Sequence, residues 1–360
     1  MQVVDNIYIH VPFCREKCAY CCFYSEEATN SKLQQAYLDR LEQQLASTNF
    51  TAPIDTLYIG GGTPTLLKTT LLQHFFSILR QYLPLTATTE ISIECNPSSI
   101  TPEKAALIID FANRISVGVQ SFKQQHRNTL GRQVTDNEIS SAIELLGQNI
   151  FNIDLIYAIP GQSISDWLDD LRLAISYKVS HLSCYSLTLE EGTALAQRSN
   201  IVIDDDISAA MWEATPTLLH DAKIERYEIS NYALPGRECR HNLNVWQGRS
   251  YLGFGPSAAS FDGIKRWTQP ASVIDWLKND APEIDLISPT ARALEVFAMG
   301  LRTTIGWSRR SWETCALPEP PTWDKMLTLT DEHNFIYETD KVRLKPSAML
   351  FWDEIAAAII

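Results

Sequence analysis

The stretch that decides the fold is Ile7-Tyr8-Ile9-His10-Val11-Pro12-Phe13-Cys14-Arg15-Glu16-Lys17-Cys18-Ala19-Tyr20-Cys21-Cys22, near the N-terminus. Residues 8–13 are rich in β-branched and aromatic side chains, which predicts a strand that stops near its proline. Cys14, Cys18 and Cys21 follow at once, with three residues in the first gap and two in the second. Three thiolates on one loop suit a cubane 4Fe–4S cluster, because they ligate three irons and leave the fourth without a protein ligand.

Two other interpretations of this loop are open. The cysteines can be reduced loop residues, or they can form a zinc site that His10 completes. Structural zinc sites usually take four ligands, commonly from two separated cysteine pairs. The chain has no second pair of that kind.

Composition narrows the class of protein. The chain has 360 residues, a formal charge of −13 and a pI near 5.0, which argues against a nucleic-acid or anionic-membrane partner. No apolar run approaches the ~20 residues of a membrane span. The N-terminus lacks a basic region followed by a cleavable apolar segment. Eight cysteines, clustered rather than evenly spread, fit a reducing compartment, so we expect a cytoplasmic protein.

Strand-then-helix units fill the first part of the chain, and their strands have near-continuous apolar runs. This pattern predicts a parallel sheet covered by helices, either an open doubly wound sheet or an incomplete (β/α) barrel. A barrel would gather the cysteine loop, the glycine run at 60–62, Glu94, Gln120 and Asp154, because all lie at carboxyl ends of strands. We therefore predict an α/β fold with a partial (β/α)6 TIM-like barrel. The expected strands are 8–13, 55–59, 90–95, 114–120, 152–157 and 181–187.

The regular alternation of strands and helices ends after about residue 204. An irregular stretch is expected at 233–263, because it is rich in Gly, Asn, Trp and Tyr. Helices at 290–301, 321–333 and 348–360, with short strands at 335–337 and 342–344, predict a small, mostly helical, winged-helix-like C-terminal domain. The predicted domains are a core barrel at 1–200, a linking region at 201–288 and the C-terminal domain at 289–360.

The run Gly60-Gly61-Gly62-Thr63 follows a predicted strand. Such a run leaves backbone amides open to a ligand that approaches closely, although a tight turn is the simpler interpretation. If the ligand is there, a side chain at Gly62 would crowd it and leave the cysteine loop intact. Glu94, Gln120 and Asp154 each end an apolar strand, where a single polar residue is as often a helix cap or a solvated loop residue.

Taken together, these motifs resemble a known superfamily. The cysteine run resembles the radical S-adenosylmethionine (SAM) signature C-x3-C-x2-C, with the Y-x-H-x-P-F-C lead-in of the oxygen-independent coproporphyrinogen oxidase group. GGGTPT, ISIE-x-NP, GVQSF and NIDLIY extend the likeness. The resemblance implies that SAM chelates the open iron and yields a 5′-deoxyadenosyl radical. It assigns SAM-binding roles to Tyr8, Tyr20, Gly61, Gly62, Thr63, Glu94, Gln120, Arg132 and Asp154.

A second motif is Cys239-Arg240-His241-Asn242-Leu243-Asn244-Val245-Trp246. A histidine among aromatic residues in an irregular loop can ligate haem iron, or it can make a structural hydrogen bond. The segment resembles the H-N-x-x-Y-W motif of HemW-type haem chaperones, with Val245 in place of the tyrosine. Ala259 likewise stands where relatives usually have histidine. The resemblance implies a protein that binds a 4Fe–4S cluster, SAM and haem, takes electrons from a reductant, and passes haem to an unidentified acceptor protein.

The alternative is a SAM-dependent coproporphyrinogen III oxidase. Such oxidases resemble this chain but carry another cysteine two residues after the third cluster ligand, where this chain has Phe23. Cys22 lies one residue early, and we interpret it as a buried thiol or a thiol near the cluster rather than a ligand. We therefore expect no oxidase activity and assign no catalytic residue.

Overall fold

The computed structural model describes residues 4–27, 30–198, 201–315, 317 and 319–360. Seven strands pair in parallel and form the centre of one large sheet. They are β1 (Asn6–Val11), β4 (Thr56–Gly61), β5 (Glu90–Cys95), β6 (Arg114–Gln120), β7 (Ile150–Tyr157), β8 (His181–Ser186) and β11 (Tyr251–Phe254).

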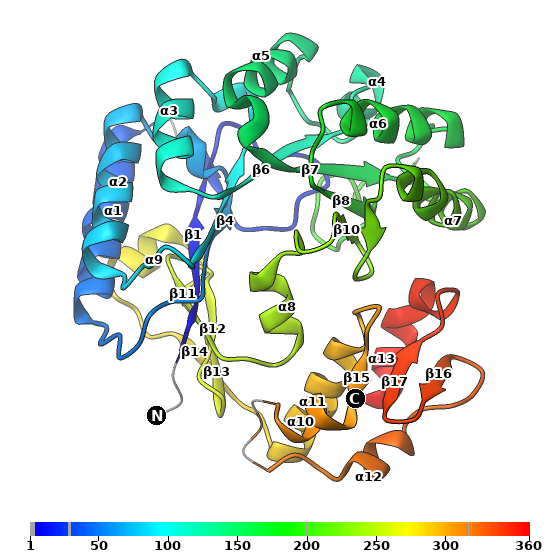
Figure 1. Cartoon of the computed structure of the whole chain (residues 1–360). Coiled ribbons are helices and arrows are strands. Elements are labelled where there is room, and N and C mark those ends of the chain that lie inside the picture. The colour runs from blue at the N-terminus through cyan, green and yellow to red at the C-terminus, as the bar shows by residue number, and fades with distance from the viewer. Residues whose placement is uncertain (1–3, 28–29, 199–200, 316, 318) are drawn as a thin grey trace.

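The strand order distinguishes the two predicted architectures. From β1 to β8 the parallel strands lie side by side in chain order. A doubly wound sheet reverses direction at a switch point, whereas a barrel adds each strand on the same side. The prediction of a partial barrel is therefore confirmed. Figure 1 shows the covering helices around the outside of the curved sheet. They are α1 (Ser31–Ser47), α2 (Thr69–Tyr82), α3 (Pro102–Phe111), α4 (Gln124–Thr129), α5 (Asp136–Leu146), α6 (Ile164–Ser176) and α7 (Asp205–Asp221).

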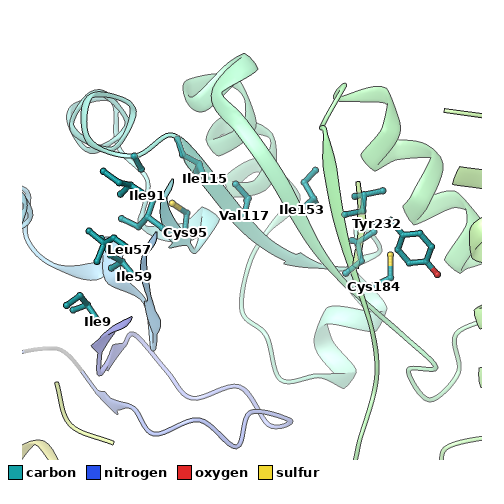
Figure 2. Packing of buried hydrophobic residues seen from close by; sticks show 14 of the residues in the cluster. Ile9, Leu57, Ile59, Ile91, Cys95, Ile115, Val117, Ile153, Cys184 and Tyr232 are labelled. Carbon is teal, nitrogen blue, oxygen red and sulfur yellow. The ribbon is translucent and has the colours of Figure 1, made fainter. Parts of the chain in front are cut away.

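Side chains alternate between the two faces of the barrel strands. Apolar residues such as Leu57, Ile59 and Val117 are fully buried on the face that packs beneath the helices (Figure 2). The other face, which lines the barrel, carries polar groups such as Asn6 and Thr56, both fully buried. The expectation of near-continuous apolar strands is thus wrong. The strands alternate, and their polar positions fill the barrel interior, where many (β/α) barrels have branched apolar residues.

The chain after residue 201 extends both edges of this sheet. Strands β10 (Asn231–Ala233) and β9 (Glu225–Arg226) continue it beyond β8, and β11 joins β1 on the other side. Beyond β11 follow β12 (Ala259–Phe261), β13 (Lys265–Thr268) and β14 (Glu283–Leu286). The predicted boundary at residue 200 falls on residues outside the described ones, and the division into domains stays a prediction.

The expectation of an irregular stretch at 233–263 is wrong in part. It contains the end of β10, the helix α8 (Arg240–Trp246), β11 and β12. Cys239, the residue before α8, makes no side-chain capping hydrogen bond, so the start of this helix lacks a capping signal in the sequence. Figure 1 shows α8 on the concave side of the sheet, between the two edges. Short helix α9 (Val273–Leu277) packs on α1.

The last part of the chain is a small helical unit around a short three-stranded sheet, in which the strand at 341–344 lies in the middle. The helix predicted at 321–333 is shorter in the structure, where it spans Trp323–Leu327. It ends there because the Thr328 and Thr330 hydroxyls donate to carbonyls of the preceding turn. A 3-10 turn replaces the start of the last predicted helix. The elements are α10 (Pro289–Gly300), β15 (Trp307–Ser308), α11 (Arg309–Glu313), α12 (Trp323–Leu327), β16 (Phe335–Glu338), β17 (Lys341–Leu344) and α13 (Trp352–Ile359).

Within the described part of the chain, no helix combines the length and the apolar character that crossing a bilayer requires.

Candidate functional site

A cavity of about 450 Å³ opens at the carboxyl ends of the barrel strands. This size is in the range of ligand pockets. The loop after β1 and the ends of β4 to β8 form its wall. The predicted site residues that line it are Cys14, Cys18, Tyr20, Cys21, Gly61, Gly62, Thr63, Glu94, Gln120, Arg132 and Asp154. Tyr8 and His241 are not among the residues that line this cavity.

The cysteine loop is tied down at both ends. Phe13–Cys14 (β2) pairs with Glu26–Glu27 (β3), and the ring Nε2 of His10 lies 3.0 Å from the carbonyl oxygen of Tyr24. A carbonyl only accepts, so Nε2 carries the proton and Nδ1 accepts from the Tyr8 hydroxyl at 3.0 Å. Both ring nitrogens of His10 are therefore in use. The zinc interpretation needs one of them as a ligand, and this geometry does not supply it.

The thiols of the loop face the cavity. The sulfur of Cys14 lies 3.7 Å from the Thr63 hydroxyl, and Arg132 Nη1 donates to the sulfur of Cys18 at the same distance. Burial raises the pKa of the Cys21 thiol to about 11, and the neighbouring thiols add to the shift. Among the described residues, no three His, Cys, Asp or Glu side chains lie close enough together to ligate a single metal ion. A cubane makes a different demand, because each thiolate ligates its own iron.

The glycine run connects β4 to the cysteine loop. The Gly62 amide donates to the Val11 carbonyl at 2.8 Å, and the Thr63 amide donates to the Phe13 carbonyl at 2.6 Å. A Cβ on Gly62 would lie 2.7 Å from the Phe13 carbonyl oxygen. The expectation that these amides are open to a ligand is therefore wrong for Gly62 and Thr63. The carbonyls of Val11 and Phe13 accept from these two amides, and the Phe13 backbone leaves no room for a side chain at Gly62.

Two carboxylates face the same cavity. Glu94 accepts from the Tyr58 hydroxyl at 2.8 Å, and Asp154 accepts from the Ser116 hydroxyl at 2.7 Å. Loss of water contact and the charge of Asp154 raise the pKa of Glu94 to about 7. Burial also raises the pKa of Asp154, against the hydrogen bonds that lower it. Two desolvated carboxylates in one pocket favour a ligand that brings positive charge or hydroxyl donors.

An arginine and a glutamine line the same cavity as the two carboxylates, and Gln120 ends β6, the strand that lies between those of Glu94 and Asp154. Arg132 donates to the carbonyl of Gly118, and its buried Nε has no hydrogen-bond partner among the described residues. A buried guanidinium with a free donor suits a carboxylate ligand. Gln120 has φ +72°, a conformation that costs energy for a non-glycine residue, at a register shift between β6 and β7. Strain of this kind often marks a functional position.

The predicted haem residue lies at the other end of the barrel. His241 is buried in α8, not in an irregular loop, and its Nδ1 lies 2.8 Å from the Thr56 hydroxyl oxygen at the start of β4. Its ring packs on that of Tyr58, with centroids 5.2 Å apart. Burial lowers the pKa of His241 to about 4, so the imidazole is neutral.

Sequence reasoning missed Tyr58, which lines the cavity. Strand alternation was the signal that could have found it. Thr56 and Tyr58 share the inward face of β4, and the apolar Leu57 and Ile59 share the outward face. Cys22 and Phe23 also line the cavity, and Phe23 is 64% exposed. Cys22 is exposed as well, so the interpretation of it as a buried thiol is wrong. The cavity therefore has an apolar side chain where the oxidase group carries its extra cysteine.

A cysteine loop and a ligand cavity at the carboxyl ends of a partial (β/α) barrel define the class, a radical SAM protein. The family model described as the Radical SAM superfamily matches residues 8–174. The heme chaperone HemW of Escherichia coli (strain K12) is 38% identical over 264 residues, which cover 70% of this chain and 69% of the relative. The heme chaperone HemW of Lactococcus lactis subsp. lactis (strain IL1403) is 31% identical over 318 residues, covering 85% and 83%. The chain therefore belongs to the HemW family of the radical SAM superfamily.

The solved structure of the coproporphyrinogen III oxidase HemN from Escherichia coli, described as a radical SAM enzyme, superposes with a TM-score of 0.84. The match covers 99% of this chain and 90% of that chain at 19% sequence identity. At this identity the likeness establishes the fold alone.

Proposed function

We propose that this protein is a haem chaperone of the cytoplasm that binds a 4Fe–4S cluster, SAM and haem, and transfers haem to an acceptor protein. The observation that carries the proposal is the convergence of three thiols, two carboxylates and a free guanidinium donor in one cavity. Membership of the HemW family directs it towards haem. The eight cysteines are free, which suits a reducing compartment.

The residues of the cavity match the chemistry of the two proposed cofactors. Cys14, Cys18 and Cys21 would hold the cluster. The Arg132 guanidinium would bind a carboxylate, and Glu94 and Asp154 would face ribose hydroxyls and positive charge. When bound, the cluster and SAM would supply one-electron chemistry at this site. The protein's own contribution is to orient the ligand and to exclude water from the floor of the cavity.

The amides of Gly62 and Thr63 are occupied, so the glycine run would act on a ligand through its carbonyl oxygens. An ammonium group is a donor and needs acceptors of that kind. The glycine run would thus still contact the SAM amino group, as predicted, but through its carbonyl oxygens rather than through its amides.

The proposed haem ligand is the Nε2 atom of His241. A metal-binding imidazole commonly holds an oxygen partner through its other nitrogen, and the Thr56 hydroxyl is in that position. The lowered pKa keeps the imidazole in the neutral form that ligates iron. Because His241 is buried beneath Tyr58, haem would reach it only if α8 or its cover moves. The reductant and the acceptor are further proposed partners.

The test is a haem titration of anaerobically reconstituted protein, followed by haem absorption. His241→Ala should weaken binding and shift the haem absorption band, with cluster content unchanged. His220→Ala is the matched control, because its imidazole is exposed and bonded to Glu225 on the outer surface. Haem binding that is equal in His241→Ala and the parent would remove His241 from the site, and no haem binding in the parent would refute the chaperone proposal.

The rival activity has its own assay. Coproporphyrinogen III, SAM and a reductant are incubated with reconstituted protein, and protoporphyrinogen is sought. We expect none, because the cavity presents Phe23 where the oxidase group carries its additional cysteine. Formation of that product would decide for the oxidase.

A further inference from the structure

Tyr58 touches both predicted cofactor regions. It lies in the middle of β4, between the carboxyl-end cavity and the amino end of the barrel, where α8 packs. No motif of the sequence marks it, and neither the SAM-binding set nor the haem motif includes it.

On the cavity side, the Tyr58 hydroxyl donates to Glu94 Oε1 at 2.8 Å. Burial and the nearby Glu94 charge hold the pKa of Tyr58 well above 10, so the hydroxyl keeps its proton and remains a donor. A carboxylate that accepts from a fixed donor is held in one orientation and favoured in its ionised form.

On the opposite side, aromatic neighbours confine the Tyr58 ring. The imidazole of His241 lies 5.2 Å away between centroids at an interplanar angle of 35°, and the ring of Tyr8 lies 6.3 Å away. His241 cannot move freely, because Thr56 holds its ring nitrogen and Glu90 accepts from its backbone amide at 3.1 Å. The position of α8 therefore limits where the Tyr58 ring, and with it the Tyr58 hydroxyl in the cavity, can lie.

We propose that Tyr58 is a positioning residue that couples His241 of α8 to the SAM cavity, by holding the Glu94 carboxylate towards the ligand while its own ring rests on the imidazole. The inference rests on the proposed binding of SAM in this cavity and extends it to a residue and a coupling. Removing the imidazole frees the ring to tilt, and the Glu94 carboxylate then loses its fixed donor.

The test measures SAM affinity by equilibrium dialysis for anaerobically reconstituted parent, Tyr58→Phe, His241→Ala and the double variant. Losing a hydrogen bond to a charged group should weaken SAM binding about tenfold in Tyr58→Phe. Losing the aromatic support should weaken it about threefold in His241→Ala. Without the hydroxyl the imidazole has nothing to position, so the double variant should match Tyr58→Phe. Additive losses would overturn the coupling.

A pH profile adds a readout that a purely structural role would not move. Tyr58→Phe removes a donor that favours ionised Glu94, so SAM affinity should start to fall at a higher pH than in the parent. An unchanged profile would contradict the positioning role. The other titratable groups that act on Glu94 are Asp154 of β7, Tyr185 of β8, Tyr8 of β1 and Cys95 of its own strand.

Two further variants separate this mechanism from loss of folding. His241→Phe keeps a ring beneath Tyr58 and should bind SAM like the parent. If His241→Phe bound SAM as weakly as His241→Ala does, the inference would be contradicted. Tyr232→Phe is the matched control, because Tyr232 of β10 also has a buried hydroxyl, which accepts from Arg226 at 2.8 Å. This variant should bind SAM like the parent. A parent that binds no SAM would overturn the proposed function and this inference together. A parent that binds SAM with Tyr58→Phe at equal affinity would overturn the inference alone.

Discussion

Both ends of the barrel carry polar inward side chains, yet one end is a cavity and the other is filled. At the amino end, Asn244 of α8 donates to Asn6 Oδ1 at 2.7 Å and to Asp55 Oδ2 at 2.9 Å, and Thr56 donates to Asn6 at 2.9 Å. At the carboxyl end, Glu94 and Asp154 face open space, and the Nε of Arg132 has no partner among the described residues.

The difference lies in where the partners come from. Buried polar groups need hydrogen bonds, and a group that the protein does not satisfy is free for a ligand. Helix α8 supplies partners at the amino end, so its polar network stabilises the fold. At the carboxyl end, Tyr58 and Ser116 each donate to one carboxylate, but both carboxylates still line the open cavity and the Nε of Arg132 has no partner among the described residues. These groups suit a ligand that carries a carboxylate and positive charge. The predictions below test this contrast.

The largest effect is expected at the cysteine loop. Changing Cys14, Cys18 or Cys21 to Ser should abolish the oxygen-labile cluster, whereas Cys22→Ser should keep most of it. The measurement is iron and sulfide content with visible absorption after anaerobic reconstitution. Equal loss in Cys22→Ser would show that the ligands are misassigned, and bound zinc in place of iron would overturn the proposed 4Fe–4S cluster.

The next effect concerns two glycines of the cavity wall. A Cβ at Gly62 meets the Phe13 backbone at 2.7 Å, next to Cys14, so Gly62→Ala should displace the loop and lose most of the cluster. This corrects the sequence-based expectation that a side chain there would spare the cluster. A Cβ at Gly118 meets the side-chain ends of Gln120 and Arg132 at 3.1 and 3.2 Å, which can move.

Gly118→Ala is therefore the matched comparison. It should keep the cluster and weaken SAM binding, as judged by iron content and equilibrium dialysis on the same preparations. If Gly62→Ala retained full cluster content, the contact with the cysteine loop would be less rigid than the structure indicates.

A smaller, graded effect is expected from pH. The pKa of Glu94 is raised from 4.5 to about 7, and a cationic ligand favours the ionised carboxylate. SAM affinity should thus be constant above about pH 7 and fall by up to about tenfold per pH unit below it, because binding must then release a proton. Glu94→Gln should bind weakly at every pH and lose most of this slope. A parent whose affinity is flat between pH 5 and 8 would remove Glu94 from the site.

The smallest effect on the ligand is expected from the filled end. Asn244→Ala removes the two contacts that its amide donates, to Asn6 and Asp55, and the oxygen that accepts from Arg249. This loss should lower the free energy of unfolding by about 1–3 kcal/mol in urea titrations. Cluster content should stay at the parent's value, and SAM affinity should change far less than in Glu94→Gln. Loss of SAM binding as large as in the cavity variants would contradict the division between the two ends.

Much of the barrel and its site followed from local sequence. The strands at 90–95 and 114–120 have the predicted bounds, because β-branched residues at alternate positions are a local signal. The cysteine spacing and the polar residues that end consecutive strands place the cavity, since parallel strands bring their carboxyl ends to one side.

Tertiary structure alone decided the rest. The parallel pairing of β11 with β1 joins residues 245 positions apart, as in the register Asn6 with Tyr251, and no local signal in either segment predicts it. The use of the Gly62 amide by Val11, the burial of His241 beneath Tyr58 and the filling of the amino end by α8 are contacts of the same long-range kind. Sequence determines which groups can donate and accept, whereas packing determines which of them the protein satisfies itself and which remain for a ligand.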